Sequence, residues 1–361
     1  TMRTIKNYVR AALPMLLGCL LFVACSDDDI AEKGVKEGLP ASLTFKMVVP
    51  DLNDAVVTRA GVEQETALNQ LMFLFYKKSD TSKPAFARVI DQLGQYSIGS
   101  DSEDESNRLY TVTISPGDTD SNGNELKSGE YYLYALANWQ NGFCSYDAEG
   151  YASKSLDELK NAILARESGA NVLDIVNNTP MTGIYGRNDG SITINEGKNS
   201  FGTTDETRVH LRRAVAKVIF NISTENGITF TPERYSIYNY SQSSTLMERS
   251  GWEGGQGTKP GNLSYEGNNS FSDFENLAFS DNTPNSFEFY MPENVQKTKE
   301  VFTEVKMREK RVSKTNETFK YAPENSIYIV IEGHYNGPRN ASDKTATYDV
   351  TASLISAVFF N

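Results

Sequence analysis

The stretch Leu43 to Ala60, LTFKMVVPDLNDAVVTRA, joins a strand pattern to a basic cleavage motif. Its apolar positions recur with a period of two: Leu43, Phe45, Met47 and Val49. This alternation predicts a strand with one buried face, and Pro50 ends it. The residues that follow have little hydrophobic period and lead to Arg59, with the small residue Ala60 behind it. A protease can bind and cut an extended loop of this kind, so Arg59 is a candidate trypsin-type cleavage point.

The predicted strand carries enough apolar surface to matter for the whole fold. Burial of four such side chains stabilises a domain by roughly 6 to 12 kcal/mol, the same order as the total stability of a typical domain. A cut at Arg59 that released this strand would leave an open groove. An extended segment from another copy of the protein would fill that groove by strand addition. The alternative interpretation is an ordinary exposed arginine in an uncut loop.

The N-terminus has the composition of a targeting segment. Residues 1–25 begin with a basic region and continue with an apolar run that is shorter than the ~20 residues needed to span a membrane. The run ends in LFVAC, which resembles a bacterial lipobox, so Cys25 is the predicted lipidation site. The acidic tetrad at 26–29, SDDD, resembles the signal that sends lipoproteins of the Bacteroidetes to the outer face of the outer membrane. A solvated tether over residues 26–40 is the simpler interpretation, and the two are compatible.

Composition excludes several classes of protein. The chain has 361 residues and a formal net charge of -12, and no basic run follows the targeting segment, so nothing favours a nucleic-acid partner. Its length after that segment suggests two domains. Of the three cysteines, Cys19 lies in the signal and Cys25 is the lipidation candidate, which leaves Cys144 alone. We therefore predict no intramolecular disulfide and no CxxC zinc site in the mature chain.

Strand patterns dominate the chain beyond Leu68. The predicted strands lie at 68–76, 88–92, 109–114, 131–138, 191–194, 208–222, 287–291 and 326–333. One helix is predicted from helical spacing at Leu156, Leu159, Ile163 and Leu164, with Ser155 and Glu158 as a capping box. Residues 241–270 are rich in Gly, Ser and Asn, which predicts long loops. The expected fold is all-β, mainly β with minor helix, in two β-sandwich domains.

The residues that could carry chemistry do not assemble into a site. The run Asp118-x-Asp120-x-Asn122-Gly123 has the oxygen ligands of half a calcium loop, but strands flank it and a turn-rich hairpin loop is the favoured interpretation. His210 and His334 are the only histidines, and they lie in different halves of the chain. No nucleophile with a base, metal cluster or phosphate loop can be built, so we predict no enzyme, no cofactor and no metal.

An ordered set of segments gives the chain a family resemblance. Behind the lipobox come Thr58-Arg59-Ala60, a strand ending in LFY, YYLYALAN (131–138), PMTG (180–183), LRRAVAKVIF (211–220) and FYMPEN (289–294). In this order they resemble the fimbrillin family of the Bacteroidetes, the type V pilins, over most of the mature chain. The resemblance implies two tandem transthyretin-like β-sandwich domains, export as a lipoprotein, removal of the N-terminal strand by an arginine-specific protease, and polymerisation by donor-strand exchange.

The resemblance assigns a role to each part of the chain. It implies a signal peptide at 1–25, a tether at 26–40, a removable strand and cleavage loop at 41–59, an N-terminal sandwich at 60–222 and a C-terminal sandwich at 223–361. Arg59 and Ala60 would form the cleaved bond, and the released strand would carry Leu43, Phe45, Met47 and Val49. The segment 208–222 would either close the first domain or open the second.

The C-terminus carries a second row of apolar residues with a period of two. The candidate donor positions are Val350, Ala352, Leu354, Val358 and Phe360, with Ser356 interrupting the row. A donor strand needs such a row, and so does an ordinary last strand of the second domain. Both interpretations stay open, because a further turn and closing strand that are usual in the family are not recognisable here.

The expected function is that of a structural subunit of a cell-surface fimbria, or pilus, that contributes to cell adhesion. Its expected partners are other fimbrial subunits, an arginine-specific protease, a host or bacterial surface ligand and, before cleavage, the outer membrane through lipid (palmitate) on Cys25. A tip or anchor subunit is one alternative. Another is a monomeric surface lipoprotein that binds glycans, for instance by stacking a sugar on Trp252.

Overall fold

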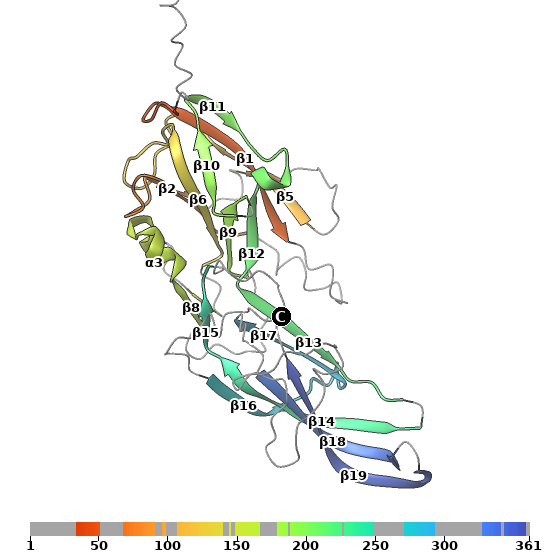
Figure 1. Ribbon diagram of the computed structural model, residues 1–361. Coiled ribbons are helices and arrows are strands. Elements are labelled where there is room, and N and C mark those ends of the chain that lie inside the picture. The colour runs from red at the N-terminus through yellow and green to blue at the C-terminus, as the bar shows by residue number, and fades with distance from the viewer. Residues whose placement is uncertain are drawn as a thin grey trace, which may run out of the picture.

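The computed structural model describes residues 34–50, 68–90, 96–98, 107–139, 144–145, 149–166, 179–186, 188–225, 227–247, 271–292, 327–340 and 343–358. Strands make up most of these residues, which confirms the predicted all-β class. Figure 1 shows a ten-stranded sheet at one end of the molecule and a four-stranded sheet at the other, with a two-stranded sheet between them.

The ten-stranded sheet contains the first predicted strand in its interior. Its order is β3-β2-β6-β9-β12-β1-β5-β4, with β10 also beside β6 and β11 also beside β1. The strands are β1 (Ala41–Pro50), β2 (Leu71–Lys77), β3 (Phe86–Ile90), β4 (Tyr96–Ile98), β5 (Asn107–Ile114), β6 (Gly129–Ala137), β9 (Met181–Tyr185), β10 (Ser191–Ile194), β11 (Gly197–Ser200) and β12 (Val209–Arg213). The strands predicted over 43–49, 68–76, 88–92, 109–114, 131–138 and 191–194 are confirmed within a few residues.

The later strands form smaller sheets. The four-stranded sheet has the order β16-β14-β18-β19, β13 pairs with β17, and β15-β8-β7 form a three-stranded sheet. These strands are β7 (Cys144–Ser145), β8 (Ile163–Arg166), β13 (Val215–Asn221), β14 (Thr229–Ser241), β15 (Ser243–Thr245), β16 (Phe271–Ala278), β17 (Ser286–Pro292), β18 (Ile327–Asn340) and β19 (Asp343–Val358). The strand β15 interrupts the region expected to be loops, and residues 248–270, with Trp252, lie outside the described residues.

The segment predicted as one strand over 208–222 is two strands. β12 pairs with β9 in the ten-stranded sheet, whereas β13 pairs with β17. The change of partner occurs at Ala214, which is buried and whose N–H donates to the carbonyl oxygen of Pro180 at 2.9 Å. No glycine or proline marks this point, so local sequence carries no sign of it. The domain boundary expected near 222 stays a prediction.

The predicted helix is shorter than expected. α3 covers Leu156–Lys160, and Ser155 and Glu158 form the capping box that the sequence predicts. Helix over Ile163 and Leu164 is wrong, because these residues begin β8 and pair with β15. Leu164 is fully buried and Ile163 is 46% exposed. The two side chains therefore lie on opposite faces of a strand rather than on one face of a helix.

Two apolar clusters occupy the two faces of β2 and β6. The first, which we call the inner cluster, is built around β1 and includes Phe45, Met47, Phe73, Phe75, Val112, Leu133 and Val209. The second, the joining cluster, includes Met72, Leu74, Tyr134 and Leu136 together with Leu159 of α3, Tyr235, Phe289 and Ile329. The joining cluster therefore connects the ten-stranded sheet to the C-terminal sheets through continuous apolar contact.

Candidate functional site

The candidate site is the seat of β1, which we define as β5, β11, β12 and the turn at 201–208. On one side β1 pairs antiparallel with β5, from Leu43 opposite Ile114 to Pro50 opposite Asn107. On the other side it runs parallel to β11 over residues 41–44 and then to β12 at Met47 and Val48. β1 thus has neighbours on both edges, and its removal would leave two unpaired strand edges.

The buried face of β1 carries the four residues predicted from the period of two. Leu43, Phe45, Met47 and Val49 are all fully buried. The ring of Phe45 meets Phe73 edge to face with 4.9 Å between the ring centroids. A strand predicted to be detachable is thus part of the inner cluster, and the space it fills is shaped for large apolar side chains.

The turn at 201–208 carries the chain from β11 to β12 alongside β1. The N–H of Phe201 donates to the carbonyl oxygen of Thr44 at 2.9 Å. Gly202 follows with φ +103°, and a Cβ atom built there would lie 2.5 Å from the Cβ atom of Lys46. Only glycine suits this position, because both the backbone conformation and the close approach to β1 exclude a side chain.

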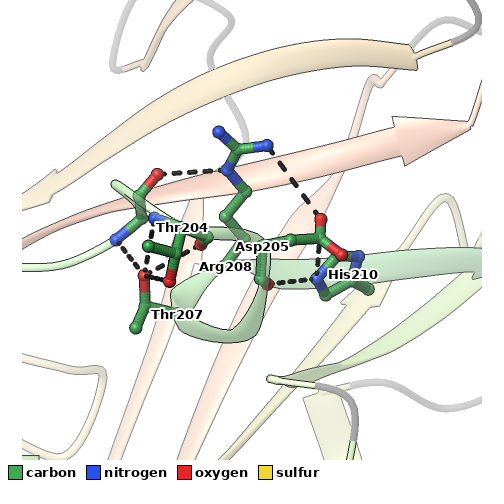
Figure 2. A network of polar contacts seen from close by, with 6 residues as sticks. Thr204, Asp205, Thr207, Arg208 and His210 are labelled. Atoms are coloured by element: carbon green, nitrogen blue, oxygen red, sulfur yellow. Dashed lines mark hydrogen bonds and ion pairs between the residues drawn. The ribbon is translucent and has the colours of Figure 1, made fainter. Parts of the chain in front are cut away.

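A network of polar contacts holds this turn in shape (Figure 2). The hydroxyl of Thr207 accepts from the N–H groups of Gly202 at 3.1 Å and Thr204 at 3.2 Å. Arg208 Nε donates to the carbonyl oxygen of Gly202 at 3.1 Å, and His210 Nε2 lies 2.7 Å from the carbonyl oxygen of Asp205. His210 therefore stabilises the turn at 201–208, which is part of the seat.

Burial also sets the chemistry of a tyrosine at the start of β6. The hydroxyl of Tyr131 donates to the carbonyl oxygen of Lys127 at 2.9 Å, and its ring meets Phe75 edge to face. Burial raises the pKa of Tyr131 to about 12, with the charge of Glu37 as a smaller cause. The phenol is therefore neutral at ordinary pH and acts as a core residue with one hydrogen bond.

The structure places the other predicted site residues apart from the seat. Val350, Ala352, Leu354 and Val358 lie in β19, opposite Tyr335, Gly333, Ile331 and Ile327 of β18. Cys25, Arg59, Ala60 and Phe360 lie outside the described residues. Lipidation, cleavage and strand donation therefore stay predictions.

The half calcium loop is a closed turn. Asp120 Oδ1 accepts from the N–H groups of Asn122 and Asn124, each at 2.8 Å, and Asp120 Oδ2 accepts from the side-chain amide of Asn124 at 3.0 Å. These bonds occupy the carboxylate, and an antiparallel bridge between Thr119 and Glu125 closes the predicted hairpin turn. The turn lies in the connection from β5 to β6, which are not neighbours in the sheet. In the part of the chain that the structure describes, no group of three His, Cys, Asp or Glu side chains could hold a metal ion.

The sequence predicts β1 itself but not the distant segments that form its seat. β11, β12 and Gly202 come from residues 197–213, which are far from β1 in the chain, and no local pattern links them to it. Gly202 alone offers a signal, since an isolated glycine between strand patterns indicates a close backbone approach.

Among the described helices, none is long and apolar enough to cross a membrane.

Comparison with known proteins gives structural neighbours only. No protein-family model and no curated protein matches this chain. It is similar to a proposed cell adhesion protein from Parabacteroides distasonis, with 16% identity and a TM-score of 0.49 over 89% of this chain and 81% of that one. A fimbrial assembly protein from the same species has 10% identity and a TM-score of 0.40 over 87% and 86%. A proposed adhesin from Bacteroides ovatus has 11% identity and a TM-score of 0.31 over 91% and 86%.

Proposed function

We propose that this chain is a structural subunit of a cell-surface fimbria, that it is exported as a lipoprotein on Cys25, and that it assembles by strand exchange after cleavage between Arg59 and Ala60. In this proposal β1 fills the seat until a protease cuts behind it, and a strand from another subunit then takes its place. The protein has no enzymatic role. Its partners are other subunits, the protease and a surface ligand.

The observation that carries this proposal is the position of β1 in the chain and in the sheet. β1 is the first strand of the described chain, and residues 51–67, which contain Arg59, separate it from Leu68 and β2. A single cut in this segment therefore places an interior strand of the sheet on a separate peptide. Most strands elsewhere have covalent links on both sides, so a single cut could not detach them.

Energetics favour exchange over simple release. The four buried side chains of β1 contribute roughly 6 to 12 kcal/mol, and two ladders of backbone hydrogen bonds add to this. A strand held this firmly leaves slowly, and the open seat would expose the inner cluster to water. A replacing strand with an equivalent apolar row restores both the apolar burial and the backbone hydrogen bonds. Cleavage is therefore expected to permit exchange without unfolding the rest of the chain.

The test is limited digestion of the full precursor with an arginine-specific protease, followed by intact mass measurement and gel electrophoresis without boiling. The expected product starts at Ala60, keeps its β-rich circular dichroism spectrum and forms a ladder of detergent-resistant oligomers. The matched control is Arg59→Gln, which keeps the loop but removes the cut, and which is expected to stay monomeric under the same treatment.

Two outcomes would overturn the proposal. The first is resistance of Arg59 to the protease while other arginines are cut, because β1 would then stay attached. The second is a folded product starting at Ala60 that stays monomeric at every concentration and does not bind an added C-terminal peptide. A tethered monomer that binds a surface ligand would then be the better account of the chain.

A further inference from the structure

Ser128, the residue just before β6, is bonded entirely to the segment that precedes β1. It is fully buried. Its hydroxyl accepts from the N–H of Leu39 at 3.0 Å and donates to the carbonyl oxygen of Lys36 at 2.5 Å. Its backbone N–H donates to the carbonyl oxygen of Leu39 at 2.8 Å, and its carbonyl oxygen accepts from Gly38 at 3.0 Å. Both backbone groups and the hydroxyl of Ser128 thus have partners within residues 36–39.

This contact fixes where β1 begins. Leu39 lies two residues before Ala41, the first buried residue of the strand, so the bonds at Ser128 set the phase of the whole apolar row. The β ladders alone define the register less strictly, because a slip by two residues keeps the same side chains facing inward. A slip of that size would put Leu43 where Ala41 now lies and would separate Leu39 from Ser128.

The segment also needs a particular backbone at Gly38, whose φ is +84°. Glycine adopts this conformation freely, and Asn and Asp adopt it more readily than other residues with side chains. A strand that seats in the same way therefore carries Gly, Asn or Asp three residues before its first buried side chain.

We propose that Ser128 sets the register of whichever strand occupies the seat, and that it does so by capturing the turn at the N-terminal end of that strand. The proposal rests on the strand exchange proposed above and names the part of the seat that selects its occupant. The occupant we assign is the C-terminal segment of a second copy of this chain.

The C-terminal sequence has Gly, Asn or Asp three residues before an apolar row in one register. Residues 349–354, DVTASL, align with residues 38–43, GLPASL, and share the tripeptide Ala-Ser-Leu. Asp349 then takes the place of Gly38, and Ala352 takes the place of Ala41. In β1 the hydroxyl of Ser42 lies 3.5 Å from the carbonyl oxygen of Gly197, a contact that Ser353 would reproduce. In the same register Ser356 takes the position of Phe45.

The seat also offers this strand a second neighbour. Among the described residues β19 pairs with β18 alone, at the edge of its sheet. In the seat it would pair with β5 on one side and with β11 and β12 on the other, so more of its backbone groups would be bonded. Transfer from its own sheet to the seat of another copy therefore exchanges one ladder, with β18, for ladders on both sides of the strand.

Register can be read by disulfide trapping on the exposed face of the sheet. The hydroxyls of Thr44 and Thr113 lie 3.3 Å apart across β1 and β5, and Ile355 is the counterpart of Thr44 in the proposed register. The protein carries Thr113→Cys and Cys144→Ser and is cut after Arg59. It is mixed with synthetic peptides of residues 345–361 that carry Ser353→Cys, Ile355→Cys or Ala357→Cys. We expect the cross-link to form mainly with Ile355→Cys.

The variant Ser128→Ala tests the proposed role directly. It is expected to spread the cross-links over all three peptides and to weaken peptide binding about three- to tenfold, as loss of one or two hydrogen bonds predicts. The matched control is Ser244→Ala, which alters another fully buried serine in a different sheet and leaves the cross-link pattern unchanged. In the uncut full chain Ser128→Ala is also expected to speed hydrogen exchange at the amide of Leu39.

The outcomes separate the register proposal from strand exchange itself. If the peptide enters the seat and Ser128→Ala keeps the parent's cross-link pattern and affinity, the register proposal is overturned and strand exchange stands. If neither this peptide nor a peptide of residues 34–50 enters the cut protein, strand exchange fails and the register proposal fails with it.

Discussion

The strands β1 and β19 have similar rows of apolar residues but differ in their positions within their sheets. β1 lies in the interior of the ten-stranded sheet with a neighbour on each side, whereas β19 lies at the edge of the four-stranded sheet and pairs with β18. β1 is the first described strand, and β19 is the last. An interior strand that one cut can detach, and an edge strand that can change partners, are the two parts that exchange between copies requires.

The largest expected effect comes from truncating the buried row of β1. Phe45→Ala removes a fully buried ring that meets Phe73 edge to face, and we expect it to lower the free energy of unfolding of the uncut chain by about 3 to 5 kcal/mol. The control Thr44→Ala, on the other face, should cost less than about 1 kcal/mol. Urea denaturation measures both. Equal effects would mean that β1 is not part of the core.

The next effect concerns the wall of the seat. Gly202→Ala forces a Cβ atom against Lys46 and strains a residue with φ +103°, so we expect a loss of about 2 to 4 kcal/mol. Gly197→Ala is the matched control in β11. It has φ +82° but nothing within 4 Å of its Cβ position, and only the strain of about 1 to 2 kcal/mol should appear. A smaller loss for Gly202→Ala than for its control would contradict the close approach to β1.

Amide hydrogen exchange sharpens the contrast between interior and edge. Successive N–H groups of a strand point to opposite sides, so those of β1 meet an acceptor strand on either side, while those of β19 do so on one side. We expect protection at consecutive amides over residues 43–45 and at residues 47 and 48, and at alternate amides over residues 345–357. Exchange followed by NMR in the uncut chain tests this. Unbroken protection along β19 would place a second strand beside it.

The smallest effect is a dependence on alkaline pH in both regions. Burial raises the pKa of Tyr131, in the inner cluster, and of Tyr235, in β14, to about 12, above the value of 10.0 for a free tyrosine. The folded state therefore favours the neutral phenol, so this contribution is complete below about pH 10 and is lost as the pH rises towards about 12. Tyr131→Phe and Tyr235→Phe should each reduce the loss of stability between about pH 9 and pH 11.5. A steeper loss in either variant would contradict this sign.

Local patterns predicted the elements better than their partners. The period of two located β1 and β18, and the capping box at Ser155 located the start of α3, because each signal lies within a few residues. The partners of β1 at 197–213 could not be predicted, since pairing between distant segments depends on the whole fold. The break at Ala214 was missed for the same reason.

The part of the seat that Ser128 supplies was equally invisible in the sequence. A single serine before a strand is common, and its role depends on a segment some 90 residues earlier, as the separation of 89 between Leu39 and Ser128 shows. The apolar pair Ile163 and Leu164 misled in another way, because four apolar residues fit a helical period while two of them belong to a strand. Both cases show tertiary contacts overriding a local pattern.

The central claim is that β1 leaves the cut chain when another strand replaces it. Native mass spectrometry of the chain cut after Arg59 measures this directly, before and after addition of a peptide of residues 345–361. The account predicts that, at a protein concentration too low for exchange between copies, the fragment containing β1 stays bound in the absence of peptide and is replaced one for one when the peptide is added. Loss of the fragment without peptide while the remainder stays folded, or retention of the fragment at saturating peptide, would contradict the account.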